Sequence, residues 1–160
     1  MSGLTRLTSQ ATWAVTSMIL WMTHEALAQR CDVTLSGVVF GIYSPQALSP
    51  LDTAGNIRVS CQGTGNVRYT ISMNRGTFGT LSTRQMASGS FRLNYNLFIN
   101  AARTTLWGDG TSGSTTLFDT YQLPAAGTVS RNYPIYARAF SQQSVGIGAY
   151  QDTITVTVDY

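Results

Sequence analysis

Apolar and polar residues alternate along most of this chain, and this alternation restricts the fold more than any other sequence feature. The longest unbroken run spans residues 91–99, and shorter runs of the same period cover residues 33–42, 57–61, 67–73 and 154–160. A period of two places successive side chains on opposite faces of a β-strand, so one face can be buried while the other meets water. After the first 28 residues, no segment keeps the apolar spacing of an amphipathic helix. The pattern therefore predicts an all-β fold.

Clusters of glycine, asparagine and proline separate the alternating runs. Examples are Gly63–Asn66, Asn74–Gly76 and Gly108–Thr111, where Gly and Asn can adopt the positive φ angles that turns require. Short strands joined by frequent turns are typical of a β-sandwich or a β-barrel. The length of 160 residues fits one domain. We therefore expect a single β-sandwich domain, with a barrel as the alternative topology.

The charge composition argues against most enzyme classes and against nucleic-acid binding. All ten basic residues are arginines, and they are scattered singly along the chain, unlike the basic stripes that bind nucleic acids. The only histidine and the only glutamate are His24 and Glu25. If both are removed with a signal peptide, Ser/His/Asp and Cys/His catalysis lose their base. We therefore expect neither an enzyme nor a bound cofactor, and no nucleic-acid partner.

Asp109 and Asp119 are the carboxylates that deserve consideration as a chemical site. Asp109 lies in a Gly-Asp-Gly sequence that could form a calcium loop or, together with Asp119, a glycosidase pair. A calcium site usually needs more carboxylates than these two, and nothing in the sequence indicates a shared cleft. The sequence favours a tight turn at Asp109, so we expect no metal site.

Residues 1–28 have the organisation of a secretory signal peptide. Arg6 gives a weakly positive start, Trp13–Met22 is a short apolar stretch, and Ala26–Ala28 forms an A-x-A cleavage pattern. The apolar stretch is too short for a membrane helix, which needs about 20 residues, so we do not expect an integral membrane protein. The mature domain would span residues 29–160. The alternative is an N-terminal core helix, for which no later segment offers a helical partner.

The two cysteines, Cys31 and Cys61, both lie in the predicted mature chain. An even number of cysteines in an exported protein favours a disulfide. This bond would close a loop of about 30 residues, which the chain-entropy model values at ~3–4 kcal/mol. The alternative is a pair of reduced, buried thiols. A zinc site is disfavoured because two cysteines without histidine cannot fill four positions.

The order of several short motifs resembles that of the spore coat protein U domain family. This family includes subunits of archaic chaperone–usher pili. The motifs are Cys31–Val33, Phe40–Tyr43, Ile57–Cys61, Arg84–Met86, Leu93–Phe98, Trp107–Thr111 and Gly148–Thr153, followed by the run that ends at Tyr160. Each motif is weak alone, but their order around the cysteine pair is specific. The resemblance covers residues 31–160.

This resemblance implies an incomplete immunoglobulin-like β-sandwich that lacks its last strand. In such subunits a periplasmic chaperone first fills the groove left by the missing strand, and the N-terminal extension of the next subunit later replaces it. An outer-membrane usher and other pilus or coat subunits are the further partners it implies. The candidates for the strand-acceptor groove are Val33, Leu35, Phe40, Ile154, Val156 and Val158. The alternative is that these residues pack in a closed core.

The chain departs from the polymerising members before its first cysteine. Those members carry an alternating donor stretch there, whereas only Gln29 and Arg30 precede Cys31 after the predicted cleavage site. Such a chain could accept a strand but not donate one, so we expect a terminal or minor subunit of a fimbria, or a secreted coat protein. The rival hypothesis is a free-standing secreted binding module, such as a glycan binder, with a complete sandwich.

Overall fold

The computed structural model describes residues 29–160, so the predicted signal peptide lies outside the described residues. The described part contains strands and loops but no helix, and therefore no helix long and apolar enough to cross a membrane. Its strands are β1 (Arg30–Ser36), β2 (Leu51–Met73), β3 (Phe78–Gly79), β4 (Arg84–Ser88), β5 (Phe91–Phe98), β6 (Leu117–Ala139) and β7 (Val156–Asp159). The predicted all-β fold is confirmed.

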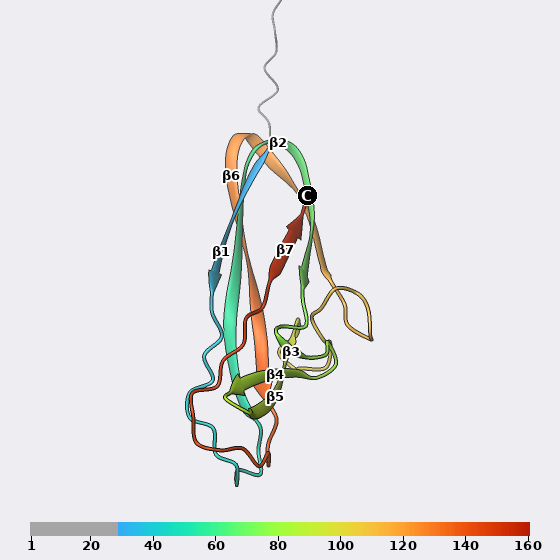
Figure 1. The fold of residues 1–160 in the computed structure, drawn as a ribbon. Helices are drawn as coiled ribbons and strands as arrows, with labels where there is room; N and C mark the ends of the chain where they lie inside the picture. Colours follow the sequence, from blue (N-terminus) through green and yellow to red (C-terminus); the bar gives the residue numbers. More distant parts are fainter. Residues whose placement is uncertain (1–28) are drawn as a thin grey trace, which may run out of the picture.

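Two long strands, β2 and β6, form the frame of the molecule. Each has 23 residues, and the two pair antiparallel over nearly their whole length, with a register shift between Gly63 and Gly65. Both glycines have positive φ angles, which glycine adopts without steric cost. The ribbon turns back on itself there, so that its two halves face each other (Figure 1). The cluster Gly63–Asn66, predicted as a turn between two strands, is therefore a bend within one strand.

The pairing places β1 and β7 on the same edge of β2. The sheet order is β1-β2-β6-β5-β4-β3, with β7 paired to β2 outside this path. Strand β1 pairs with the first half of β2 and β7 with the second half, while β6 occupies the other edge of both halves. Because β2 turns back between its halves, β1 and β7 run in opposite directions and face each other across the two layers (Figure 1).

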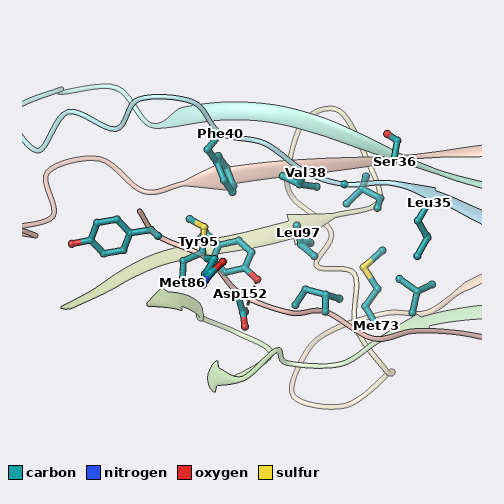
Figure 2. A pocket seen from close by; sticks show the side chains of 15 residues that line it. Leu35, Ser36, Val38, Phe40, Met73, Met86, Tyr95, Leu97 and Asp152 are labelled. Atoms are coloured by element: carbon teal, nitrogen blue, oxygen red, sulfur yellow. Dashed lines mark hydrogen bonds between the residues drawn. The ribbon is translucent and has the colours of Figure 1, made fainter. Parts of the chain in front are cut away.

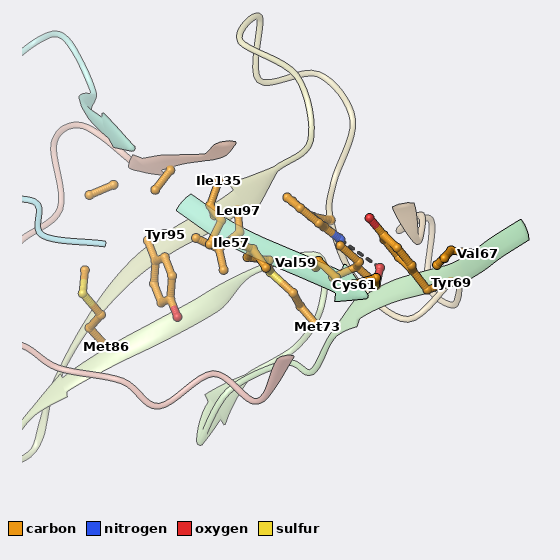
Figure 3. Packing of buried hydrophobic residues seen from close by; sticks show 14 of the residues in the cluster. Ile57, Val59, Cys61, Val67, Tyr69, Met73, Met86, Tyr95, Leu97 and Ile135 are labelled. Atoms are coloured by element: carbon orange, nitrogen blue, oxygen red, sulfur yellow. Dashed lines mark hydrogen bonds between the residues drawn. The ribbon is translucent and has the colours of Figure 1, made fainter. Parts of the chain in front are cut away.

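The core lies between the two halves of the ribbon (Figure 3). Alternate residues of β2 fill it from both layers, which is the period-two pattern seen in the sequence. They are Ile57, Val59 and Cys61 from the first half and Val67, Tyr69, Ile71 and Met73 from the second. Burial of each large apolar side chain contributes about 1.5–3 kcal/mol. Trp107 is also fully buried, and its indole N–H donates a hydrogen bond to the carbonyl of Ile71 (3.1 Å).

Arg84 is a fully buried charged residue at the edge of this core. Its guanidinium donates to the carbonyls of Asn74 (2.8 and 3.0 Å) and Trp107 (2.8 Å) and to Oδ1 of Asn96 (2.6 Å). Burial lowers the pKa of Arg84, and the nearby Tyr95, among other groups, opposes this shift. The arginine stays protonated and joins the end of β2 to β5 and to the loop that carries Trp107.

The predicted disulfide between Cys31 and Cys61 is confirmed. The two cysteines face each other in the β1–β2 pairing, so the bond links β1 covalently to the first half of β2. No free cysteine occurs in residues 29–160.

Candidate functional site: a groove between two strand edges

An apolar groove separates β1 from β7. We call β1 together with residues 37–43 the first wall, and residues 150–159, which include β7, the second wall. A cavity of about 320 Å³ lies between the walls (Figure 2). It is lined by Leu35, Ser36, Gly37, Val38 and Phe40 from the first wall, Tyr150, Gln151, Asp152, Ile154 and Val156 from the second, and Met73, Met86, Tyr95, Leu97 and Ile135 from the floor.

A second cavity continues the groove away from the β2 bend. It has a volume of about 700 Å³ and lies between residues 38–45 and 145–150. The two cavities share Val38, Phe40, Met86 and Tyr150, so they form one continuous groove. Ile42 and Ile147 line this end and are almost completely exposed. None of the residues that line the second cavity is charged.

The backbone edges on both sides of the groove are unpaired. Within the described residues, β1 and β7 each pair only with β2, so each has one edge whose N–H and C=O groups face no other strand. Residues 152–155 belong to no strand. Such edges are the places where another chain can add a strand.

The outer edge of β6 differs from these two edges. It pairs with β5 only over Tyr136–Ala139, and the rest of it carries Pro124 and Pro134. Proline cannot donate a backbone hydrogen bond, so it discourages strand addition at an open edge. Neither β1 nor β7 contains a proline.

Four of the six groove candidates line the first cavity, namely Leu35, Phe40, Ile154 and Val156. Val33 and Val158 continue the same faces of β1 and β7 beyond the cavity. Val33 is 39% exposed and Leu35 is 56% exposed, although their partners in β2, Val59 and Ile57, are fully buried. The inner face of β1 is therefore uncovered, as expected beside an empty strand position.

The floor of the groove could not be assigned from the sequence. Its residues come from β2, β4, β5 and β6, and each lies at an inward position of its strand. The alternation identifies such residues as buried, but it does not indicate which buried residues lie next to the gap.

Asp152 holds the second wall in place. Its carboxylate accepts hydrogen bonds from the Tyr95 hydroxyl (2.7 Å) and from the backbone N–H groups of Thr77 (2.8 Å) and Thr153 (2.7 Å). Burial raises the pKa of Tyr95, and the hydrogen bond to Asp152 raises it further, so the phenol stays protonated. The arrangement joins the second wall to β5 and to the loop after β2.

The two aspartates considered as a chemical site lie in separate hydrogen-bond networks. Asp109 is an exposed turn residue, and the Thr111 hydroxyl and N–H groups hold the pKa of Asp109 below its usual range. A glycosidase acid needs a raised pKa. Asp119 instead accepts a hydrogen bond from the Tyr133 hydroxyl. Among residues 29–160, no three His, Cys, Asp or Glu side chains gather in a group that could hold a metal ion.

Two solved structures are similar to this chain, and the first of them has the same overall fold. One is a chain in the crystal structure of the CsuC–CsuE chaperone–tip adhesion subunit pre-assembly complex from archaic chaperone–usher Csu pili of Acinetobacter baumannii, with a TM-score of 0.54 and 24% identity. The match covers 83% of this chain and 40% of that chain, so this chain spans less than half of that protein. The other is the E. coli Hda pilus minor tip subunit HdaB, with a TM-score of 0.40, 17% identity and 79% of each chain covered. No curated protein sequence matches the chain.

A sequence-family model assigns the chain to a protein family. The model of the Spore Coat Protein U domain matches residues 17–157, which is most of the chain and includes both cysteines, the floor and first wall of the groove, and all but the last two residues of the second wall. This match confirms the resemblance that the order of the motifs indicated. The chain therefore belongs to the Spore Coat Protein U domain family.

Proposed function

We propose that this protein is an exported structural subunit of a fimbria or surface coat, and that it is completed by a strand from another protein. The observation that carries the proposal is the apolar groove between the unpaired edges of β1 and β7. A strand laid in this groove would pair with backbone groups of the walls, and its alternate side chains would enter the cavities. Main-chain hydrogen bonds then supply affinity, and the cavities supply specificity.

The geometry of the walls restricts how such a strand can lie. Because β1 and β7 run in opposite directions, an inserted strand is parallel to one wall and antiparallel to the other. The edge of β6 carries prolines and does not compete. The protein therefore offers one acceptor groove, between the edges of β1 and β7, which fits a structural role in assembly better than an enzymatic one.

The partners follow from this role. A periplasmic chaperone would fill the groove during export, an outer-membrane usher would receive the complex, and another subunit would later supply the strand. The structure of the CsuC–CsuE complex joins a chaperone to a tip adhesion subunit before assembly, which is the kind of intermediate proposed here. The protein would pass through the periplasm and end at the cell surface.

A synthetic alternating peptide tests the groove. We expect a peptide of about ten residues, with aliphatic side chains at every second position, to bind the purified protein and raise its melting temperature by several degrees, since such a peptide can span the groove at roughly 3.3 Å per residue. Leu35→Asp should abolish this stabilisation because it places a charge on the inner face of β1. Thr34→Asp is the matched control, since Thr34 lies on the opposite face of the same strand. Calorimetry and thermal unfolding measure both effects.

A second pair of variants probes the other wall. Val156→Asp should weaken binding of the peptide, whereas Thr157→Asp, its neighbour on the outer face of β7, should not. A peptide with the same composition but no alternation serves as the ligand control. Equal stabilisation by both peptides, or equal loss in all four variants, would contradict strand addition in the groove.

The proposed export signal has its own test. We propose that the first 28 residues are removed after Ala28, which leaves Gln29 as the new N-terminus. N-terminal sequencing of the protein recovered from the periplasm should then begin at Gln29. A start well before this position would overturn the predicted boundary, and it would retain a segment that could act as a donor strand.

A further inference from the structure

Tyr95 contacts both walls of the groove. It lies on the floor, in β5, and is 4% exposed. Its ring packs edge-on against Phe40 of the first wall, with the ring centroids 5.9 Å apart. Its hydroxyl donates to Asp152 of the second wall at 2.7 Å. One side chain of the floor therefore contacts both walls of the first cavity (Figure 2).

The middle of the second wall is held by no sheet, although Gln151 before it pairs with Ala87 of β4 and β7 after it pairs with β2. Residues 152–155 lie outside every strand. Apart from Asp152, their connection to the rest of the molecule includes Asn74, whose N–H donates to the Thr155 carbonyl (3.1 Å) and whose Oδ1 accepts from the Thr155 N–H (3.0 Å). Asn74 is itself held by the buried Arg84.

The hydrophobic effect favours closure of an unfilled apolar groove. Exposed apolar walls lower their free energy by approaching each other and excluding water. A groove that accepts one strand must instead keep its walls about two strand spacings apart, which is roughly 9–10 Å. A groove held at this width before binding avoids the cost of reorganisation and binds more tightly than one that must be reopened.

We propose that Tyr95 is a spacer that keeps the groove open at the width of one strand before a partner binds. This inference rests on the proposed strand-acceptor function. The aromatic ring supports the first wall, and the hydroxyl, through Asp152, fixes the distance to the second. The raised pKa of the phenol keeps it a hydrogen-bond donor over the whole physiological pH range. Tyr95 is thus a positioning residue, which acts by setting the distance between the walls.

Tyr95→Phe tests the spacer because it keeps the ring and removes only the hydroxyl. We expect amide hydrogen exchange in residues 150–156 of the free protein to increase roughly tenfold, as after loss of one charge-assisted hydrogen bond. The affinity for the alternating peptide should fall by a similar factor. Saturating peptide should restore slow exchange in this segment because the bound strand then separates the walls.

Tyr133→Phe is the matched control. The Tyr133 hydroxyl also donates to a carboxylate, that of Asp119, but Tyr133 does not line either cavity. This variant should leave exchange in residues 150–156 and peptide affinity unchanged. Asp152→Ala removes the other partner together with the hydrogen bonds from Thr77 and Thr153, so its effects should be in the same direction as those of Tyr95→Phe and larger.

Two results would overturn the proposal that Tyr95 is a spacer. One is unchanged exchange and affinity in Tyr95→Phe; the other is increased exchange spread evenly over the whole sheet, which would indicate a general loss of stability. Failure of the wild-type protein to bind any alternating peptide would instead contradict the proposed function. The exchange measurement on the free protein separates these cases, since it needs no peptide.

Discussion

Replacing Arg84 by alanine should lower the free energy of unfolding by about 4 kcal/mol or more, because each buried acceptor left without a partner costs ~1–3 kcal/mol and the lost side chain leaves a cavity. The orphaned groups are the carbonyls of Asn74 and Trp107, while the Oδ1 atom of Asn96 keeps only its hydrogen bond from the Leu97 N–H. Trp107 is the only tryptophan after residue 28 and is fully buried. Urea unfolding followed by its fluorescence measures the change.

The control for this prediction is Arg58→Ala. Arg58 is exposed on β2, and its guanidinium donates to the Ser130 hydroxyl. Loss of such a surface contact should change stability by less than about 1 kcal/mol. A similar small loss in Arg84→Ala would mean that water or neighbouring groups replace the buried guanidinium, and that its hydrogen bonds do not hold this part of the fold together.

Removal of the disulfide should have the second largest effect. The Cys31→Ala/Cys61→Ala double variant should be less stable by ~3–4 kcal/mol, the value of closing a loop of about 30 residues in the chain-entropy model. The loss should be concentrated in β1, because without the disulfide this strand is held only by its backbone pairing with β2. Hydrogen exchange should therefore show opening of the first wall before the second, and affinity for the alternating peptide should fall.

The reduced wild-type protein provides the comparison. Treatment with dithiothreitol should reproduce the destabilisation of the double variant, whereas the double variant itself should not respond to the reductant. If β1 stays protected from exchange after reduction, its backbone pairing with β2 is sufficient to hold the first wall, and the disulfide has no role in the groove.

The sequence predicted the strands whose inward face is continuously apolar. Residues 91–99 were expected as a strand, and all but the last of them form β5; the break at Ser36–Gly37 coincides with the end of β1. The final strand is shorter than the alternating run, since only Val156–Asp159 pairs with β2. The preceding residues belong to the second wall, where no neighbour is present to define a strand.

Strand β6 was not predicted, and its composition explains why. Its inward positions in the two halves include Asp119, Tyr121, Arg131 and Tyr133, opposite inward residues of β2. These polar and aromatic side chains satisfy one another, as in the contact of Tyr133 with Asp119 and the stacking of Arg131 over Tyr121. A pattern based on apolar residues alone does not detect a face of this kind.

The sequence predicted the walls of the candidate groove but not its floor. The walls of the groove lie near the two ends of the part of the chain that the structure describes, where alternation and family resemblance both point to unpaired strands. The floor depends on which inward residues the folded ribbon brings beneath the gap, such as Ile135 of β6 and Met86 of β4. That juxtaposition follows from tertiary packing and has no local signal in the sequence.

The shared attachment of β1 and β7 to a single strand has a mechanical consequence. Tension that reaches either wall through an inserted segment passes into β2, whose backbone crosses from one layer to the other at Gly63–Gly65 without an intervening loop. A pull along the strand axes then loads many hydrogen bonds at once in shear, so they do not open one after another. The fold can thus carry load along its strands, and the cysteine bridge near the bend ties β1 to the first half of β2 within one layer.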